Sequence, residues 1–517
     1  MSEPAATAEA GGGVAFESTA GRWLLAVAVV GSGMAFLDGT VVNVALPDIG
    51  RDFNASTSAL QWILNGYLLT LASLILLGGS LGDRYGRRRI FVFGVGLFTV
   101  ASLLCAIAPS AEFLIGARML QGIGGALLTP GSLAIIEASF RPGDRARAIG
   151  AWSGLGGVAT AFGPLLGGYL IGAISWRAIF VINLPIGIFV AWAATRHVPE
   201  SSNPGATGRI DLQGAVLTAL GLAGTTYALI EAPGGASAAV LVAGIGGVLA
   251  LVAFFVVEHR SPNPMLPLEI FRSRQFSAAN AVTFVVYAAL SGFFFLLVAF
   301  LQISMNYTPI EAGAASLPVT LLMLIFSARS GALAQRIGAR LPLTLGPLII
   351  AAGLLMLLMV NPGDSYLTTV LPAIVVFGLG LTLVVAPVTA TVLAAASVNH
   401  SGIASGVNNA VARVAGLLAV AVLPVIAGLT GDSFYDPAKM TDGFHTAMIV
   451  CAVLAALGGA LAWLTISSTV LHAEPEPGGD TPEQLAEDHF CAINGTPLRP
   501  GREADCVPEA EAERVGT

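Results

Sequence analysis

Long apolar segments alternate with short polar ones along most of the chain. Fourteen such segments can be drawn, at residues 23–46, 60–81, 90–108, 113–136, 148–174, 178–195, 212–230, 236–257, 276–301, 312–328, 341–360, 367–388, 403–429 and 444–466. An α-helix needs roughly 17 to 25 apolar residues to cross a bilayer, whereas membrane β-strands are about ten residues long with alternating polarity. The pattern therefore predicts an all-α polytopic membrane protein with fourteen transmembrane helices.

The composition agrees with this prediction. Of the 517 residues, 55% are hydrophobic and only 11% are charged, and the mean hydropathy is +0.81. Soluble domains carry about 25% charged residues. The 62 glycines suit helices that approach one another closely in lipid. We therefore expect the lipid bilayer as the surrounding medium, and the net charge of −7 gives no reason to expect a nucleic-acid partner.

Basic residues are distributed unevenly between alternate loops. If the N-terminus is cytoplasmic, sixteen arginines fall in cytoplasmic segments before the tail, against Arg51, Arg177 and Lys439 outside. Cytoplasmic loops of membrane proteins are rich in basic residues. We therefore expect a multi-pass protein of the cell membrane with both termini in the cytoplasm.

Two loops repeat the same residues. The loop at 79–88 shares five of ten positions with the loop at 331–340, at a constant offset of 252. This predicts two six-helix repeats with two inserted helices between them, a plan that resembles the parallel repeats of secondary transporters. We accordingly divide the chain into a cytoplasmic N-terminal segment (1–21), an N-terminal six-helix bundle (22–198), two inserted transmembrane helices (199–258), a C-terminal six-helix bundle (259–470) and an acidic, disordered cytoplasmic tail (471–517).

Two opposite charges interrupt the apolar segments of the first repeat. Asp38 lies in the first segment and Arg118 in the fourth. A carboxylate at mid-membrane costs roughly 2.5 to 3.5 kcal/mol on insertion scales and marks a functional site by default. Because removal from water favours the protonated form of a carboxylate, Asp38 is a candidate proton carrier. Two plainer interpretations stay open: Asp38 as an inert residue that pairs helices, and Arg118 as a side chain that reaches the membrane surface.

Five motifs occur in a fixed order. They are the stretch 37–47 around Asp38, the loop 79–89, the segment 118–126, the Gly-Pro-Leu-Leu-Gly-Gly segment 163–168 and the segment 176–185. Together they resemble the major facilitator superfamily, and specifically its fourteen-helix drug:proton antiporter family. The resemblance covers roughly residues 20–470. It implies a secondary transporter rather than an enzyme, without a cofactor.

The resemblance implies roles for three groups of residues. Asp38 and Arg118 would form a pair that separates when Asp38 takes up a proton, and arginine can compete with that proton because it stays charged. A gating loop would close the cytoplasmic side through Gly79, Asp83, Arg84, Gly86, Arg87 and Arg88. The bent fifth helix would be the antiporter signature, with Gly163, Pro164, Gly167 and Gly168. The plainer alternatives are a positive-inside anchor for the loop and a close-packing device for the helix.

Other polar residues inside the apolar segments are candidates for the substrate cavity. They are Asn43, Trp62, Asn65, Gln121, Trp152 and Asn183. Each residue type is equally typical of helix-packing hydrogen bonds or of the membrane interface. Arg413, in the thirteenth segment, is expected near the cytoplasmic side, in a structural role or as part of the gate.

The energy source is inferred by exclusion. A phosphate-binding loop of the Gly-x-x-x-x-Gly-Lys type needs a lysine, and the single lysine, Lys439, lies in an Asp-Pro-Ala-Lys-Met context. The histidines form no His-Glu-x-x-His zinc motif, so no metal is expected. We predict a monomeric, proton-coupled exporter of small amphipathic or cationic drugs that works by alternating access. Export of an endogenous lipid, antibiotic or siderophore is the main alternative, followed by nutrient import and by a non-transporting membrane receptor.

Overall fold

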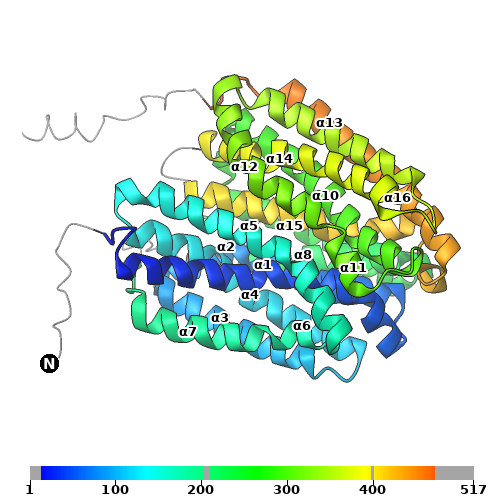
Figure 1. The fold of residues 1–517 in the computed structure, drawn as a ribbon. Helices are drawn as coiled ribbons and strands as arrows, with labels where there is room; N and C mark the ends of the chain where they lie inside the picture. Colours follow the sequence, from blue (N-terminus) through cyan, green and yellow to red (C-terminus); the bar gives the residue numbers. More distant parts are fainter. Residues whose placement is uncertain (1–12, 203–209, 263, 397–400, 472–517) are drawn as a thin grey trace, which may run out of the picture. The chain divides into compact units, whose positions relative to one another are not determined.

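The structure, a computed structural model, describes residues 13–202, 210–262, 264–396 and 401–471. Within these residues all regular structure is helical, apart from one isolated bridge between Val14 and Phe140. Figure 1 shows the order of the helices along the chain. The predicted acidic tail lies outside the described residues.

The first repeat comprises the helices formed by the first six apolar segments. They are α1 (Thr19–Phe53), α2 (Thr57–Tyr85), α3 (Arg87–Ala106), α4 (Ala111–Ser139), α5 (Pro142–Ala173), α6 (Ala178–Val181) and α7 (Asn183–His197). We refer to α1–α7 as the N-terminal half. The two inserted segments form α8 (Leu212–Glu231) and α9 (Ala238–Arg260).

The second repeat follows the same order, with a short helix before its second long one. Its members are α10 (Arg274–Ile303), α11 (Pro309–Ala314), α12 (Leu317–Ile337), α13 (Arg340–Met356), α14 (Leu371–Ala394), α15 (Ser401–Ile426) and α16 (Pro437–Thr465). We refer to α10–α16 as the C-terminal half. Short 3-10 or π turns lie at Ala232–Gly234, Leu268–Arg272, Leu357–Met359, Tyr366–Val370 and Gly431–Phe434.

Thirteen helices in the described part of the chain are long and apolar enough to cross a membrane. They coincide with thirteen of the predicted segments, which confirms an all-α, multi-pass membrane fold. The remaining predicted segment corresponds to α5. The apolar part of α5 among the described residues, Phe162–Ala173, is shorter than a membrane-spanning helix. The total of fourteen spans therefore stays a prediction.

Local sequence signals explain where the first helix begins and ends. The Ser18 hydroxyl accepts a hydrogen bond from the Gly21 N–H at 3.0 Å, which satisfies one of the free donors at the start of α1. At the other end Asn54 adopts a left-handed conformation with φ of +47°, which residues other than glycine rarely do, asparagine excepted. The short turn that follows leads into α2, which begins at Thr57.

Helices pack mainly within each half. In the N-terminal half α4 lies against α2 and α3, and α1 against α5, while in the C-terminal half α10 packs on α16 and α13 on α14. Glycine permits the closest approach between α2 and α4, because a side chain at Gly122 would meet the backbone oxygen of Tyr67. The predicted division into two six-helix bundles is in keeping with this packing and stays a prediction.

Hydrogen bonds between the two halves gather where α1 ends and α2 begins. Five of them, all among the described residues, run from a side chain to a backbone carbonyl. They join Thr57 to Gly431 at 2.9 Å, Gln61 to Val420 and Ala421 at 2.8 and 3.1 Å, Gln302 to Val44 at 2.9 Å, and Tyr435 to Ala55 at 2.8 Å. At this end the two halves are therefore in direct contact.

Candidate functional site

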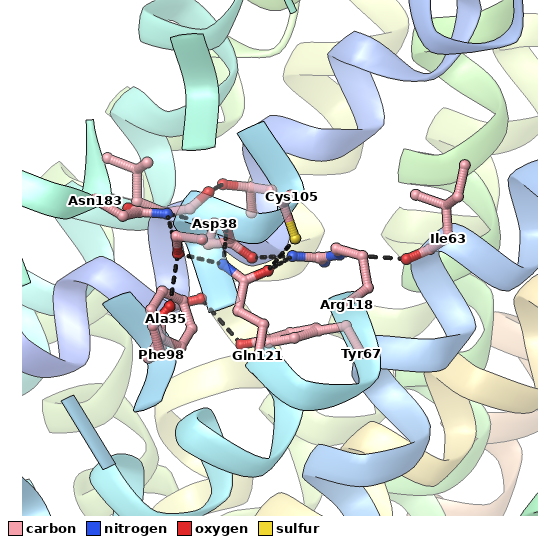
Figure 2. A network of polar contacts seen from close by, with 12 residues as sticks. Ala35, Asp38, Ile63, Tyr67, Phe98, Cys105, Arg118, Gln121 and Asn183 are labelled. Atoms are coloured by element: carbon pink, nitrogen blue, oxygen red, sulfur yellow. Dashed lines mark hydrogen bonds and ion pairs between the residues drawn. The ribbon is translucent and has the colours of Figure 1, made fainter. Parts of the chain in front are cut away.

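The two intramembrane charges of the N-terminal half meet in the structure. A guanidinium nitrogen of Arg118, on α4, donates a hydrogen bond to Oδ2 of Asp38, on α1, although the residues are 80 positions apart in sequence (Figure 2). Asp38 is 0% exposed and Arg118 is 1% exposed. A buried charge is costly unless it is paired and hydrogen-bonded. The pair meets that requirement, which excludes the interpretation of Arg118 as a side chain reaching the membrane surface.

Two amides hold the other carboxylate oxygen. Gln121 and Asn183 donate to Oδ1 of Asp38 at 2.8 and 3.2 Å. The same two amide nitrogens also reach the hydroxyl of Ser102, on α3, at 2.9 and 3.3 Å. Gln121 and Asn183 were predicted for the substrate cavity; the structure places both beside Asp38, and their part in a substrate cavity stays a prediction. Asp38 therefore has hydrogen bonds to residues of α4 and α7, and the same two amides link it to α3 through Ser102.

Arg118 has further partners besides the carboxylate. Its guanidinium donates to the side-chain oxygen of Gln121 at 2.5 Å and to the backbone oxygen of Ile63 at 3.3 Å. Its Cζ lies 4.4 Å from the centre of the Tyr67 ring, a cation–π distance. Cys105 completes the surroundings with a contact of 3.7 Å from its sulfur to Gln121. Figure 2 shows these groups around the Asp38–Arg118 pair.

The network is built for an ionised carboxylate. Both oxygens of Asp38 accept hydrogen bonds, and the donors are an arginine and two amide nitrogens. A protonated carboxyl carries one O–H donor of its own. A proton on the oxygen that faces Arg118 would set donor against donor and break that contact. A proton on that oxygen is therefore incompatible with the Asp38–Arg118 hydrogen bond.

The predicted gating loop forms a compact set of ion pairs. Asp83 pairs with Arg87, one helical turn away, at 2.8 Å. Arg88 donates to the backbone oxygen of Val198 at 3.0 Å and its backbone N–H donates to Glu200 at 3.1 Å. These contacts join the start of α3 to the segment that follows α7. The gating role itself stays a prediction.

Gly86 occupies the turn of that loop for a conformational reason. Its φ is +108°, which side-chain-bearing residues rarely adopt. A Cβ at this position would also lie 2.6 Å from the carboxylate oxygen of Glu200. The close approach of Glu200 thus depends on the absence of a side chain.

The predicted antiporter helix packs between the two halves. Side chains at Gly163 and Gly167 would collide with Thr40 and Val41 of α1, and one at Gly168 with the backbone of Pro309 at α11. Pro164 lies within α5, and its carbonyl is the group that a side chain at Gly313 would meet. The glycines therefore allow α5 to touch both α1 and α11. An antiport role for this helix stays a prediction.

The other predicted cavity residues have separate surroundings. Trp62 donates to Glu231 at the end of α8 at 3.1 Å, and Trp152 donates to the Ser32 hydroxyl on α1 at 2.8 Å. Asn65 is fully buried, with no hydrogen-bond partner for its amide among the described residues. Asn43 is half-buried on α1. These four do not join the Asp38 network.

Three members of the network were not predicted from the sequence. Ser102 and Cys105 lie on one face of α3, and Tyr67 lies on α2. A signal was available for two of them, because Thr99, Ser102 and Cys105 recur at intervals of three residues inside an apolar segment. Tyr67 carried no such signal, since a lone aromatic residue is common in any membrane helix.

The fold and the buried charges define a multi-pass membrane protein with a transporter architecture. The family model of the Major Facilitator Superfamily matches residues 28–420. The chain belongs to this superfamily, which confirms the resemblance drawn from the motifs.

Relatives of known name are similar over most of their length. The chain is 38% identical over 405 residues to "Multidrug resistance protein Stp" of Mycobacterium tuberculosis, which covers 77% of this chain and 75% of that protein. It is 35% identical over 456 residues to the "Methylenomycin A resistance protein" of Bacillus subtilis, covering 87% and 96%. It is 35% identical over 416 residues to the "Tetracenomycin C resistance and export protein" of Streptomyces glaucescens, covering 80% and 77%.

Solved structures share the fold at low sequence identity. A bacterial homologue of the human lysosomal transporter Spinster, in an inward-facing and unoccupied conformation, is 19% identical with a TM-score of 0.63, covering 88% of this chain and 98% of that one. The peptide transporter POT in complex with sulfate is 17% identical with a TM-score of 0.64, covering 89% and 98%.

Proposed function

We propose that this protein is a proton-coupled exporter of amphipathic drugs, antibiotics included, that works by alternating access. The relatives named for multidrug and antibiotic resistance support the choice of cargo. The observation that carries the coupling proposal is the sealed ion pair of Asp38 and Arg118 inside the membrane. An ionisable residue buried at this depth is a candidate proton site by its chemistry.

Protonation of Asp38 is the proposed trigger. The carboxylate takes up a proton, loses its contact with Arg118 and becomes neutral, so that only the amide contacts with Gln121 and Asn183 remain favourable. Arg118 keeps its charge and its contacts with Gln121 and the Ile63 carbonyl. The N-terminal half thus has two internal arrangements, one for each protonation state, and each favours a different facing of the carrier.

The inter-half hydrogen bonds support an assignment of facing. They lie at the ends of α1 and α2 that the arginine distribution places outside the cell. Contact between the halves at this end supports the proposal that this conformation is closed to the outside. Opening to the outside requires the loss of these bonds and of the α5–α11 contact.

Proton flux in proteoliposomes tests the proposal. With an imposed pH gradient, addition of a cationic dye such as ethidium is expected to drive proton movement for the wild type and not for Asp38→Asn. Glu269→Gln, which removes a carboxylate from a side chain that is 82% exposed, serves as the matched control and is expected to keep the flux. Equal proton flux for wild type and Asp38→Asn would refute coupling through Asp38.

A narrower cargo is the second candidate. The name of one relative includes the export of a single antibiotic, tetracenomycin C. An exporter of one endogenous compound would respond to few members of a panel of lipophilic cations and neutral amphiphiles, whereas a multidrug exporter responds to many. The breadth of the panel response therefore separates the two.

A further inference from the structure

A third charge lies in a membrane-spanning helix of the other half of the protein. Arg413 is the thirteenth of the 26 residues of α15, which runs from Ser401 to Ile426. The sequence suggested a place near the cytoplasmic end, but the structure puts Arg413 at the middle of the helix. A cation at the centre of a membrane helix needs a counter-charge or water.

The face of α15 that carries Arg413 points at the N-terminal half. Leu417, one turn further on, belongs to an apolar cluster with Leu69 and Ala72 of α2. A Cβ at Gly406, two turns earlier, would lie 3.0 Å from Leu76 of α2. Residues spaced by four and by seven share one face of a helix. Arg413 therefore shares the face that α15 turns towards α2.

Electrostatic effects agree with this position between the halves. Arg413 lies within electrostatic range of the hydroxyl groups of Tyr67, on α2, and of Tyr287, on α10. Tyr67 also lies beneath the guanidinium of Arg118. The two arginines, on opposite halves of the protein, therefore share Tyr67 as a neighbour.

Arg413 has no counter-ion among the described residues. It forms neither an ion pair nor a hydrogen bond there, and its side chain is half-exposed. Asp38 is already occupied by Arg118. The two arginines and one aspartate of this region carry a net positive charge, and the partly buried Arg413 holds it at the face of α15 that packs on α2.

From this geometry we propose that Arg413 binds an anionic group of the transported molecule, such as a carboxylate or a phenolate. The inference rests on the proposed export function and adds a charge class to its cargo. A planar guanidinium forms two parallel hydrogen bonds with a carboxylate, which gives direction as well as affinity. A molecule with an apolar body and one anionic group would replace the missing counter-ion.

The membrane potential favours such a cargo. Export of an anion moves negative charge out of a cell whose interior is negative, and each elementary charge contributes about 2.3 kcal/mol per 100 mV. Proton entry in exchange adds a second charge movement in the same electrical direction. Anion export is thus driven by both components of the proton gradient.

Binding of two probes that differ only in charge tests the inference. The probes are 2-naphthoate and its neutral amide, 2-naphthamide, titrated into the full-length protein in lipid nanodiscs near neutral pH. We expect the wild type to bind the carboxylate roughly tenfold more tightly or better, as for a charge-assisted hydrogen bond. Arg413→Gln is expected to lose this preference while binding the amide as the wild type does, and Arg413→Lys to keep part of it.

Controls make each outcome decisive. Arg272→Gln removes a charge from a side chain that is 83% exposed, and it is expected to leave the preference unchanged. Equal binding of the two probes by the wild type, or a preference that survives in Arg413→Gln, would overturn the inference. Ethidium-driven proton flux is measured in parallel on the same proteins. Intact flux with no charge preference refutes only the role of Arg413, whereas absence of flux in the wild type with ethidium and with 2-naphthoate alike refutes the export proposal itself.

Discussion

The stability of the protein is expected to depend on pH differently when one or the other partner of the buried ion pair is replaced. Asp38→Asn leaves a charged arginine in the network, and Arg118→Gln leaves an aspartate. Breaking a buried pair by removing one partner usually costs about 3 to 5 kcal/mol, because the remaining charge stays buried without compensation. The difference between the variants lies in whether that remaining charge can be removed.

Arginine cannot lose its proton in the accessible pH range, whereas aspartate can gain one. Asp38→Asn therefore carries its full cost at every pH. In Arg118→Gln the remaining carboxylate can be neutralised by a proton. Over the pH range in which the folded variant holds that proton and the unfolded chain does not, its stability falls as the pH rises, by about 1.4 kcal/mol per pH unit.

Buried cysteines provide the assay. Cys105 and Cys451 are free thiols without access to solvent in the folded protein. In a background with Cys491→Ser and Cys506→Ser, a fluorogenic thiol reagent reports their exposure during heating, and the unfolding midpoint is compared at each pH with that of the protein whose ion pair is intact. The midpoint of Arg118→Gln should approach the wild-type value as the pH falls, while the deficit of Asp38→Asn should stay constant.

A variant with both Asp38→Asn and Arg118→Gln tests whether the two side chains are coupled. This double variant has no uncompensated charge in the network, so it should be more stable than the sum of the two single changes predicts. Parallel pH profiles for the two single variants, or additive losses in the double variant, would show that the side chains are not coupled in the membrane.

Three further changes test individual contacts. Gly86→Ala is expected to lower stability by about 1 to 3 kcal/mol, since it places a side chain at positive φ against Glu200; the thermal unfolding midpoint measures this. Glu231→Gln weakens the charge-assisted bond from Trp62, worth roughly 1.5 to 3 kcal/mol, and should speed hydrogen exchange in α8. Gly313→Val should reduce dye efflux without unfolding the protein, since its side chain would push the backbone of α5 away from α11.

The opposite results are equally informative. An unchanged midpoint for Gly86→Ala would mean that the loop can move away from Glu200 at no cost. Unchanged exchange in α8 would show that the inserted helices are held by their apolar contacts alone. Full efflux by Gly313→Val would contradict the proposal that the halves must close against each other at α5 and α11.

Much of the helical arrangement could be predicted from the sequence because lipid imposes it. A chain that crosses a bilayer must satisfy its backbone groups within each segment, so long apolar runs become helices. Hydropathy alone does not predict the finer breaks. The break between α11 and α12 comes after Ala314 inside an apolar stretch, and its local signal is Pro318 in the first turn of α12, which the hydropathy pattern does not register.

The candidate site was only partly visible in the sequence. Asp38 and Arg118 were marked by their charge, but their contact depends on how α1 rotates against α4, and local periodicity does not determine that rotation. Trp62 was assigned to the cavity, yet it lies against α8, because the packing of the inserted helices leaves no trace in the local pattern. Arg413 was noticed as a charge, and its depth and its missing partner came only from the structure.

The acceptors that join the halves have a consequence for sequence divergence. In each of these hydrogen bonds the acceptor is a backbone carbonyl, at Val44, Ala55, Val420, Ala421 or Gly431. A carbonyl remains in place whatever side chain its residue carries. Mutations at the acceptor positions can therefore accumulate while the junction persists, and selection acts on the few donors, Thr57, Gln61, Gln302 and Tyr435. A homologue that has drifted widely at the acceptors should still close in the same way if those four donors are kept.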